Sequence, residues 1–362
     1  MSEQRIAISP RNLLLIFATG LLVVLLWQLS GLFVILMIAV VLAASLAPII
    51  ESAEQLRIPR WLAVILVYLG LLAILTGVGL AIGPTVIAQI QGLFQRLPGY
   101  LEVLVALVDN LARRLGITEP AISQFFDTQT LTSWAIRSSQ QLLVRSYGVT
   151  RGFVGGAFSL ILALFLSGYM LSGSKQLIKG LVSLFPKPWD ERLAAQVKPM
   201  SKRMGNYIQG RVLVSGILAV VISVGLKALG ISEFALGLGA IAGVTNLIPF
   251  FGPVLGAIPA LIVAIAQGSW TFLWVLLLFL IIQNVETYVL DPLLVGSSVK
   301  IHPLYQLLAV IGGAQVLGII GALIVPPWVA GASVVLENLY LQPKRLSEQQ
   351  AAAIASPSAE QA

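Results

Sequence analysis

Long apolar runs separated by short polar segments dominate this chain. Residues 12–31, for example, form a run of twenty residues without a charge, which is enough helix to cross a hydrocarbon core of about 30 Å. Apolar segments lie near residues 13–30, 32–50, 61–83, 152–172, 211–229, 235–267, 270–290 and 304–336. The pattern predicts an all-α polytopic membrane protein with about eight transmembrane segments, some of them broken or re-entrant.

Residues 84–151 have a different, amphipathic pattern. Leucine and valine recur at helical spacing between Leu97 and Leu115, while Asp109 and Arg113 fall on the other face. We expect a helical extracytoplasmic insertion lying on or beside the bilayer, as a packing or oligomerisation element rather than a ligand-binding domain. The full division of the chain is a three-span region (1–83), this insertion (84–151), a fourth span (152–172), a basic loop (173–210), a C-terminal membrane region (211–336) and a polar tail expected to be disordered (337–362).

The distribution of charge predicts the topology. Between Lys175 and Arg211, eight lysine and arginine residues stand against two acidic ones, which places this segment in the cytoplasm. Counting spans back from it places the insertion outside the cytoplasm and the N-terminus inside. The net charge of +7 is explained by these flanking residues, so we expect membrane lipid and not nucleic acid as a partner.

Composition excludes several kinds of chemistry. The chain is 58% hydrophobic and only 10% charged, whereas soluble domains carry roughly 25% charged residues. It has no cysteine and one histidine, which excludes disulfides, thiolate chemistry and histidine-rich metal sites. It also lacks a phosphate-binding loop and a credible catalytic triad. We therefore expect no enzyme activity, no catalytic residues, no metal site and no cofactor.

The stretch "TNLIPFFGPVLGAIPA" (245–260) interrupts the apolar segment 235–267 with three prolines. Proline removes a backbone donor, and freed backbone groups at membrane depth must face protein or a cavity. We expect a re-entrant hairpin or a discontinuous span, with small residues on both arms packing closely. The candidate residues for a solute path are Asn246, Pro249, Phe250, Gly252 and Pro253. The plainer alternative is a kinked packing helix.

A second glycine-rich segment, 307–335, is expected to break at Pro326-Pro327, unless these prolines simply lie near the interface. Two broken segments flanking one span are typical of transporter binding sites. The flanked span ends with the polar candidates Gln283, Asn284, Glu286 and Asp291. A carboxylate at membrane depth is by default a functional hypothesis, so Glu286 is the candidate for carrying a proton or binding a cation or solute.

These polar residues also have ordinary interpretations. Glu286 would be hydrated if it lay near the interface, or neutralised if it paired with Lys300, and Asp291 precedes a proline as a helix-terminal residue does. His302 is a candidate proton relay, although a single histidine before proline is more often a loop or capping residue.

The proline-rich motifs resemble those of the autoinducer-2 exporter (AI-2E) family, which includes PerM-type permeases. The first motif is carried by Asn246, Ile248, Pro249, Phe250, Gly252, Pro253, Gly256 and Pro259. The second is carried by Pro292, Gly296, His302 and Pro303, and the glycine-rich helix that follows also matches. The resemblance covers nearly the whole chain. It implies a bacterial inner-membrane protein with about eight spans, cytoplasmic termini and a homo-oligomeric assembly.

Members of this family are associated with export of autoinducer-2, and others with sodium/proton antiport. From the resemblance and the polar helix together, we expect a secondary transporter that exports a small polar solute, autoinducer-2 or a related signal. A sodium (lithium)/proton antiporter is the first alternative. A non-transporting membrane scaffold is the second.

Overall fold

The computed structural model describes residues 10–114, 146–296 and 302–355, and in these ranges every regular element is a helix. In chain order they are α1 (Pro10–Gln28), α2 (Ser30–Gln55), α3 (Arg60–Arg114), α6 (Ser146–Ser172), α7 (Ser174–Val182), α8 (Trp189–Ala228), α9 (Ala235–Thr245), α10 (Phe251–Gln267), α11 (Ser269–Val285), the π-helix η1 (Glu286–Gly296), α12 (Pro303–Leu336), the π-helix η2 (Glu337–Leu341) and α13 (Gln342–Ala355). The predicted all-α class is confirmed.

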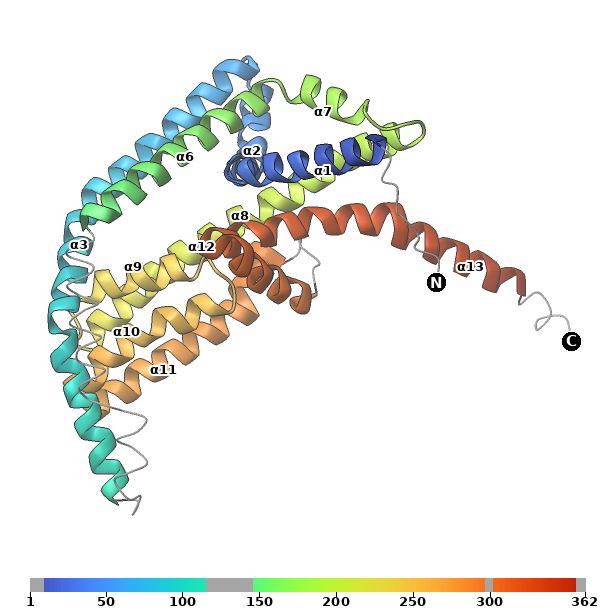
Figure 1. Cartoon of the computed structure of the whole chain (residues 1–362). Helices are drawn as coiled ribbons and strands as arrows, with labels where there is room; N and C mark the ends of the chain where they lie inside the picture. Colours follow the sequence, from blue (N-terminus) through green and yellow to red (C-terminus); the bar gives the residue numbers. More distant parts are fainter. Residues whose placement is uncertain (1–9, 115–145, 297–301, 356–362) are drawn as a thin grey trace, which may run out of the picture.

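The helices form two groups that α3 and α8 connect (Figure 1). In one group, the first part of α3 packs with α2 and α6 around Ile50, Ala63 and Leu171. In the other, α8, α9, α10 and α11 share the largest hydrophobic core, with Leu226 and Leu238 fully buried in it. Leu93 of α3 also enters this core, so one continuous helix contributes to both groups.

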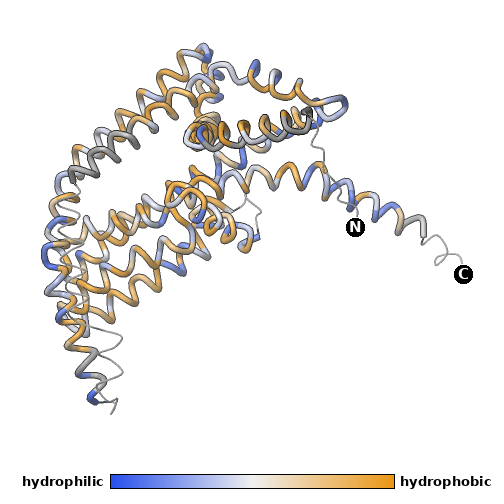
Figure 2. The backbone as a smooth tube through the Cα atoms, in the orientation of Figure 1, coloured by the Kyte–Doolittle hydropathy of each residue, from blue (hydrophilic) through white to orange (hydrophobic). Residues whose placement is uncertain are grey.

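Hydrophobic residues predominate along most of the helices (Figure 2), and many of their side chains are exposed. On α3, for example, Leu69, Ile74 and Leu80 are largely exposed, which would be unfavourable in water but suits contact with lipid tails. Among the described residues, five helices are long and apolar enough to span a membrane, or six if the bent pair α6–α7 counts as one span. The predicted count of eight is therefore approximate, because some of the predicted segments are shorter helices or hairpins.

The helix that contains the third apolar segment does not end near residue 83. α3 continues through Pro84 and Pro98 to Arg114, a length of about 80 Å at 1.5 Å per residue, well beyond the hydrocarbon thickness. Its second part therefore contributes the amphipathic helix expected at the start of the insertion. The remaining residues of that insertion up to 145 lie outside the described ranges.

The segment 235–267 is a helical hairpin. α9 and α10 pack against each other in an antiparallel register, because a Cβ added at Gly256 would lie 2.7 Å from the Cα of Ala242, and one added at Gly252 would collide with the Thr245 carbonyl. Small residues on both arms thus allow the close approach that the sequence predicted. The expected re-entrant or discontinuous arrangement is observed here, and a straight helix is not.

The second broken segment turns at a different place from the one predicted. Pro326 and Pro327 lie buried inside α12, and the non-helical residue is Gly318, with φ 65° and ψ −150°. A Cβ added at Gly313 would collide with the Gly321 carbonyl, so the chain folds back on itself around Gly318. Only glycine adopts such a backbone conformation without strain, which is why the turn forms there.

Two polar segments are more helical than the sequence suggested. The basic stretch after α6 forms α7 and the first part of α8 instead of an irregular loop. The tail, expected to be disordered, continues from α12 through η2 into α13 as far as Ala355.

Candidate functional site

A buried ion pair lies where α8 passes the start of η1. Arg211 of α8 donates from Nη1 to Oε1 of Glu286 at 3.0 Å, and the two side chains are only 5% and 4% exposed. Charged groups at this degree of burial are rare unless they are paired, because each loses its hydration. The pair joins the middle of α8 to the first residue of the π-helix.

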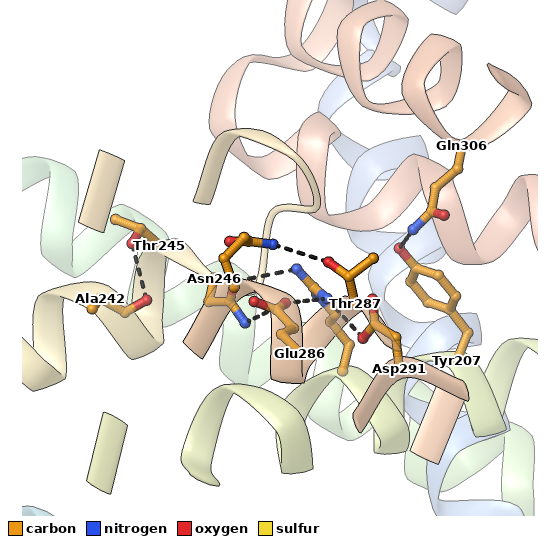
Figure 3. A network of polar contacts seen from close by, with 10 residues as sticks. Tyr207, Ala242, Thr245, Asn246, Glu286, Thr287, Asp291 and Gln306 are labelled. Carbon is orange, nitrogen blue, oxygen red and sulfur yellow. Dashed lines mark hydrogen bonds and ion pairs between the residues drawn. The ribbon is translucent and has the colours of Figure 1, made fainter. Parts of the chain in front are cut away.

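Asn246, at the end of α9, connects this ion pair to the hairpin turn (Figure 3). Its Nδ2 donates to Glu286 Oε1 at 3.0 Å, and its Oδ1 accepts from Arg211 Nη2 at 3.4 Å. Asp291 accepts from Arg211 Nη1 at 3.3 Å, and its side chain is 39% exposed. These four side chains, which we call the polar cluster, link three elements, and Asp291 connects the cluster to the outside.

The π-helical backbone explains how both carboxylates reach Arg211. In an α-helix, residues five positions apart point about 140° away from each other. In a π-helix the backbone hydrogen bonds join i to i+5, so residues five apart become neighbours on one face. Glu286 and Asp291 are so related within η1, and Pro292 lies in the same helix. The residue pattern did not indicate this geometry, because α-helical spacing places residues five positions apart on different faces.

The hairpin turn satisfies its own backbone. The amides of Ile248, Phe251 and Gly252 donate to carbonyls within the turn at 2.8–3.0 Å. Of the two expected environments for backbone groups at the break, protein or a cavity, these three amides have protein partners. Pro249 and Gly252 shape a compact turn, in which Phe250 has φ 66°, and this turn presents the Asn246 side chain.

Arg211 retains hydrogen-bonding capacity that the cluster does not use. Its Nε and the Oγ of Ser215, one turn further along α8, are buried and have no hydrogen-bond partner among the described residues. A buried donor without a partner costs about 1–3 kcal/mol. One turn before Arg211, Tyr207 accepts a hydrogen bond from Gln306 of α12 at 3.3 Å, so polar contacts continue along α8 towards the second hairpin.

The structure brings only some of the predicted residues together. Asn246, Glu286 and Asp291 meet, whereas Asn284 is exposed and bonds to the Leu280 carbonyl of its own helix. Gln283 bonds to Thr287. Of the remaining candidates, Phe250 is exposed in the turn, and Pro253 lies in the first turn of α10.

His302 caps α12, accepting a hydrogen bond from the Leu304 amide at 3.3 Å and lying edge-on to Tyr305. The capping interpretation therefore describes its observed contacts. Lys300, the predicted partner of Glu286, lies outside the described residues, and the observed partner is Arg211.

Sequence reasoning missed Arg211. It was counted only as the last basic residue of the cytoplasmic segment, because it stands at the first position of the predicted fifth span. α8 runs straight through that position from the polar to the apolar stretch, so the arginine lies mid-helix. The turns of α8 that follow Arg211 pack closely on α9, with Ser215 and Ala219 against Gly243, and this packing is visible only in the structure.

The described residues contain no group of three or more histidine, aspartate and glutamate side chains that could hold a metal ion. A buried network at the turn of a helical hairpin, within an all-α chain of membrane-spanning helices, defines a polytopic membrane protein of the transporter class. The chain belongs to the AI-2E family of transporters, whose sequence profile matches residues 14–341. This is a family of transporters, not of enzymes.

The names of similar proteins agree with membership of a transporter family. The chain is 29% identical over 303 residues to YueF of Bacillus subtilis (strain 168), covering 82% of this chain and 81% of that protein. It is 29% identical over 314 residues to YrrI of the same organism, covering 84% and 85%. Both are provisionally named transport proteins. PerM of Escherichia coli (strain K12), provisionally named a permease, is 28% identical over 297 residues, covering 78% and 80%.

Proposed function

We propose that this chain is a secondary transporter that exports a small polar solute, with autoinducer-2 or a related signal as the candidate because the family is named for it. The supporting observation is the polar cluster, where a buried arginine bridges the hairpin turn to the carboxylates of η1. In this proposal the cluster is the solute or coupling site. No ATP is required, since the sequence has no phosphate-binding loop.

The cluster is poorly explained as a stabilising feature. Replacing a buried ion pair by apolar side chains is often neutral or stabilising, so such a pair is weak support for a structural role. Ionisable residues at membrane depth typically mark solute or ion pathways. Here the charges join three different elements, namely α8, the α9–α10 hairpin and η1.

The contacts of the polar cluster support a mechanism in which a solute or a proton competes with the hydrogen bonds inside the cluster. A solute oxygen bound to Arg211, or a proton on Glu286, would weaken the contacts that tie the hairpin turn to η1. Asp291 is half-exposed and contacts the same guanidinium, so it offers the first point of access from one side. Movement of the hairpin against η1 would then expose the site to the other side, as alternating access requires.

Export can be tested in bacterial cells that produce autoinducer-2 but lack their own exporters of it. Expression of this chain should increase the external signal. The Glu286→Gln and Arg211→Gln variants should abolish that increase at equal membrane abundance. Glu337→Gln is the matched control, because Glu337 pairs with Arg203 of the same helix α8 at the less buried end. External signal unchanged by wild-type expression would contradict the export proposal.

Cation/proton antiport is the second candidate, and the charges of the cluster favour it. Arg211 carries one positive charge against the carboxylates of Glu286 and Asp291, so one negative charge is left for a proton, sodium or lithium ion. Liposomes with an internal pH-sensitive dye test this: added sodium or lithium should drive proton movement through wild type but not through Glu286→Gln. No movement in well-inserted wild-type protein would eliminate this candidate.

The scaffold alternative makes a different prediction, because substitutions at Asn246 or Gly252 would then change stability without changing flux.

We also propose residence in the bacterial inner membrane as a homo-oligomer with both termini in the cytoplasm. The supports are the family membership and the basic residues around α7 and α8.

A further inference from the structure

The segment that follows α6 changes direction sharply. Between α6 and α7 the axis bends by 85° at a break around Gly173. α6 exposes apolar side chains such as Phe165 and Tyr169, as a lipid-facing helix does. If α6 crosses the bilayer, a helix turned by 85° at its end runs close to the plane of the membrane surface.

α7 is amphipathic, and its apolar side is only partly covered by the rest of the protein. Lys175 and Lys179 are four residues apart and share one side, while Leu177 and Leu181 share the opposite side. None of the α7 residues is buried, and Leu181 is 61% exposed. A helix with basic residues on one side and exposed apolar residues on the other is typical of elements that lie in a membrane interface.

The turn after α7 extends the same surface. Leu184 is 78% exposed, and Phe185 and Trp189 are also exposed. The amides of Leu184 and Phe185 donate to carbonyls of the last turn of α7, which holds these side chains in place. Tryptophan is enriched at membrane interfaces, where its ring spans the boundary between apolar and polar regions.

The charge of this surface selects the kind of lipid. From residue 173 to residue 189 the basic residues are Lys175, Lys179 and Lys187, and there is no acidic residue. Lysines near an anionic membrane surface contribute to binding, and the attraction falls off within a Debye length. A zwitterionic surface would match the apolar side chains but not these three charges.

We propose that α7 and the following turn to Trp189 form a docking surface for anionic phospholipid. The apolar side chains of Leu181, Leu184 and Phe185 enter the interface, and the three lysines bind lipid headgroups. The surface anchors the end of α6 and the beginning of α8, which carries Arg211 further along the same helix. This inference does not depend on the proposed solute.

The chain has no cysteine, so single labels can be placed without background. An environment-sensitive fluorophore is attached at Leu184→Cys, on the proposed docking surface, or at Gln176→Cys, on the lysine side. The labelled full-length protein is reconstituted in phosphatidylcholine vesicles with or without phosphatidylglycerol. Nitroxide-bearing lipids report contact with the bilayer.

We expect severalfold stronger quenching at position 184 than at position 176, and a further increase when phosphatidylglycerol is present. The variant Lys175→Gln/Lys179→Gln/Lys187→Gln should remove that increase, whereas Lys198→Gln/Lys202→Gln on α8 should keep it. Equal quenching at the two positions would overturn the proposal. So would a label at position 184 that is shielded from nitroxide lipids, or one that responds identically in both vesicle types.

Discussion

At the scale of single residues, Arg211 is the centre of the polar cluster. It contacts Glu286, Asp291 and Asn246 through its two terminal nitrogens, while its Nε has no hydrogen-bond partner in the described part of the chain. Losing Arg211 would leave the carboxylate of Glu286 buried with only the Asn246 amide as a partner. An uncompensated buried charge typically destabilises a protein by about 3–5 kcal/mol.

We therefore predict that Arg211→Gln markedly lowers the thermal unfolding midpoint in detergent. The double variant Arg211→Gln/Glu286→Gln should recover much of that loss, since it removes both charges. A double-mutant cycle measured by unfolding of the purified protein tests the coupling.

The control cycle uses Arg203 and Glu337, whose partly exposed pair should contribute no more than about 1 kcal/mol. An unfolding midpoint for Arg211→Gln equal to that of wild type would show that the ion pair does not form.

At the scale of elements, two helical hairpins flank α11 and η1, namely α9–α10 and the folded α12. The first was predictable, because proline and glycine cluster at its turn and small residues line both arms. The turn of the second was predicted at the wrong place, because the prediction relied on proline as the helix breaker and not on glycine. Pro326 and Pro327 are tolerated inside a buried helix, whereas Gly318 adopts a backbone conformation that other residues avoid.

The hairpin in α12 can be tested by cross-linking. A Cβ added at Gly313 would lie 3.0 Å from the Cβ of Val325, whereas in a continuous helix residues twelve apart are about 18 Å apart. Disulfides need Cβ atoms roughly 3.5–4.5 Å apart, so the two arms of the hairpin must separate slightly, and the same separation relieves the contact between the added Cβ and the Gly321 carbonyl. We predict that Gly313→Cys/Val325→Cys forms an intramolecular disulfide on mild oxidation.

The matched control is Gly70→Cys/Ile82→Cys, with the same spacing on the continuous helix α3. It should keep both thiols free, as should each single variant. Free thiols persisting in the Gly313→Cys/Val325→Cys protein after oxidation would argue for a continuous α12.

The candidate site was only partly readable from the sequence. Asn246, Glu286 and Asp291 stood out because polar residues are rare in such apolar segments. Arg211 did not, since a basic residue at the edge of a predicted span is ordinary. Glu286 and Asp291 both reach Arg211 because the backbone of η1 is π-helical, and the residue pattern did not predict a π-helix.

At the scale of the whole molecule, the polar cluster lies beside the largest hydrophobic core, close to the boundary where α8 changes from basic to apolar. α2, the first part of α3 and α6 form the other group, and α8 also packs on α2 through Met204 and Ala44. Relative motion of the two groups would be transmitted through α8, the helix that carries Arg211.

The most direct test of a transport role for the cluster is efflux of autoinducer-2 from proteoliposomes of wild type, Arg211→Gln, Glu286→Gln and Glu337→Gln. We predict protein-dependent efflux that responds to an imposed pH gradient, a loss of at least about tenfold in the two cluster variants, and little change in Glu337→Gln. A tenfold loss corresponds to about 1.4 kcal/mol, less than the removal of one buried charge partner. Wild-type efflux rates in well-inserted, correctly folded Arg211→Gln and Glu286→Gln proteins would contradict the account.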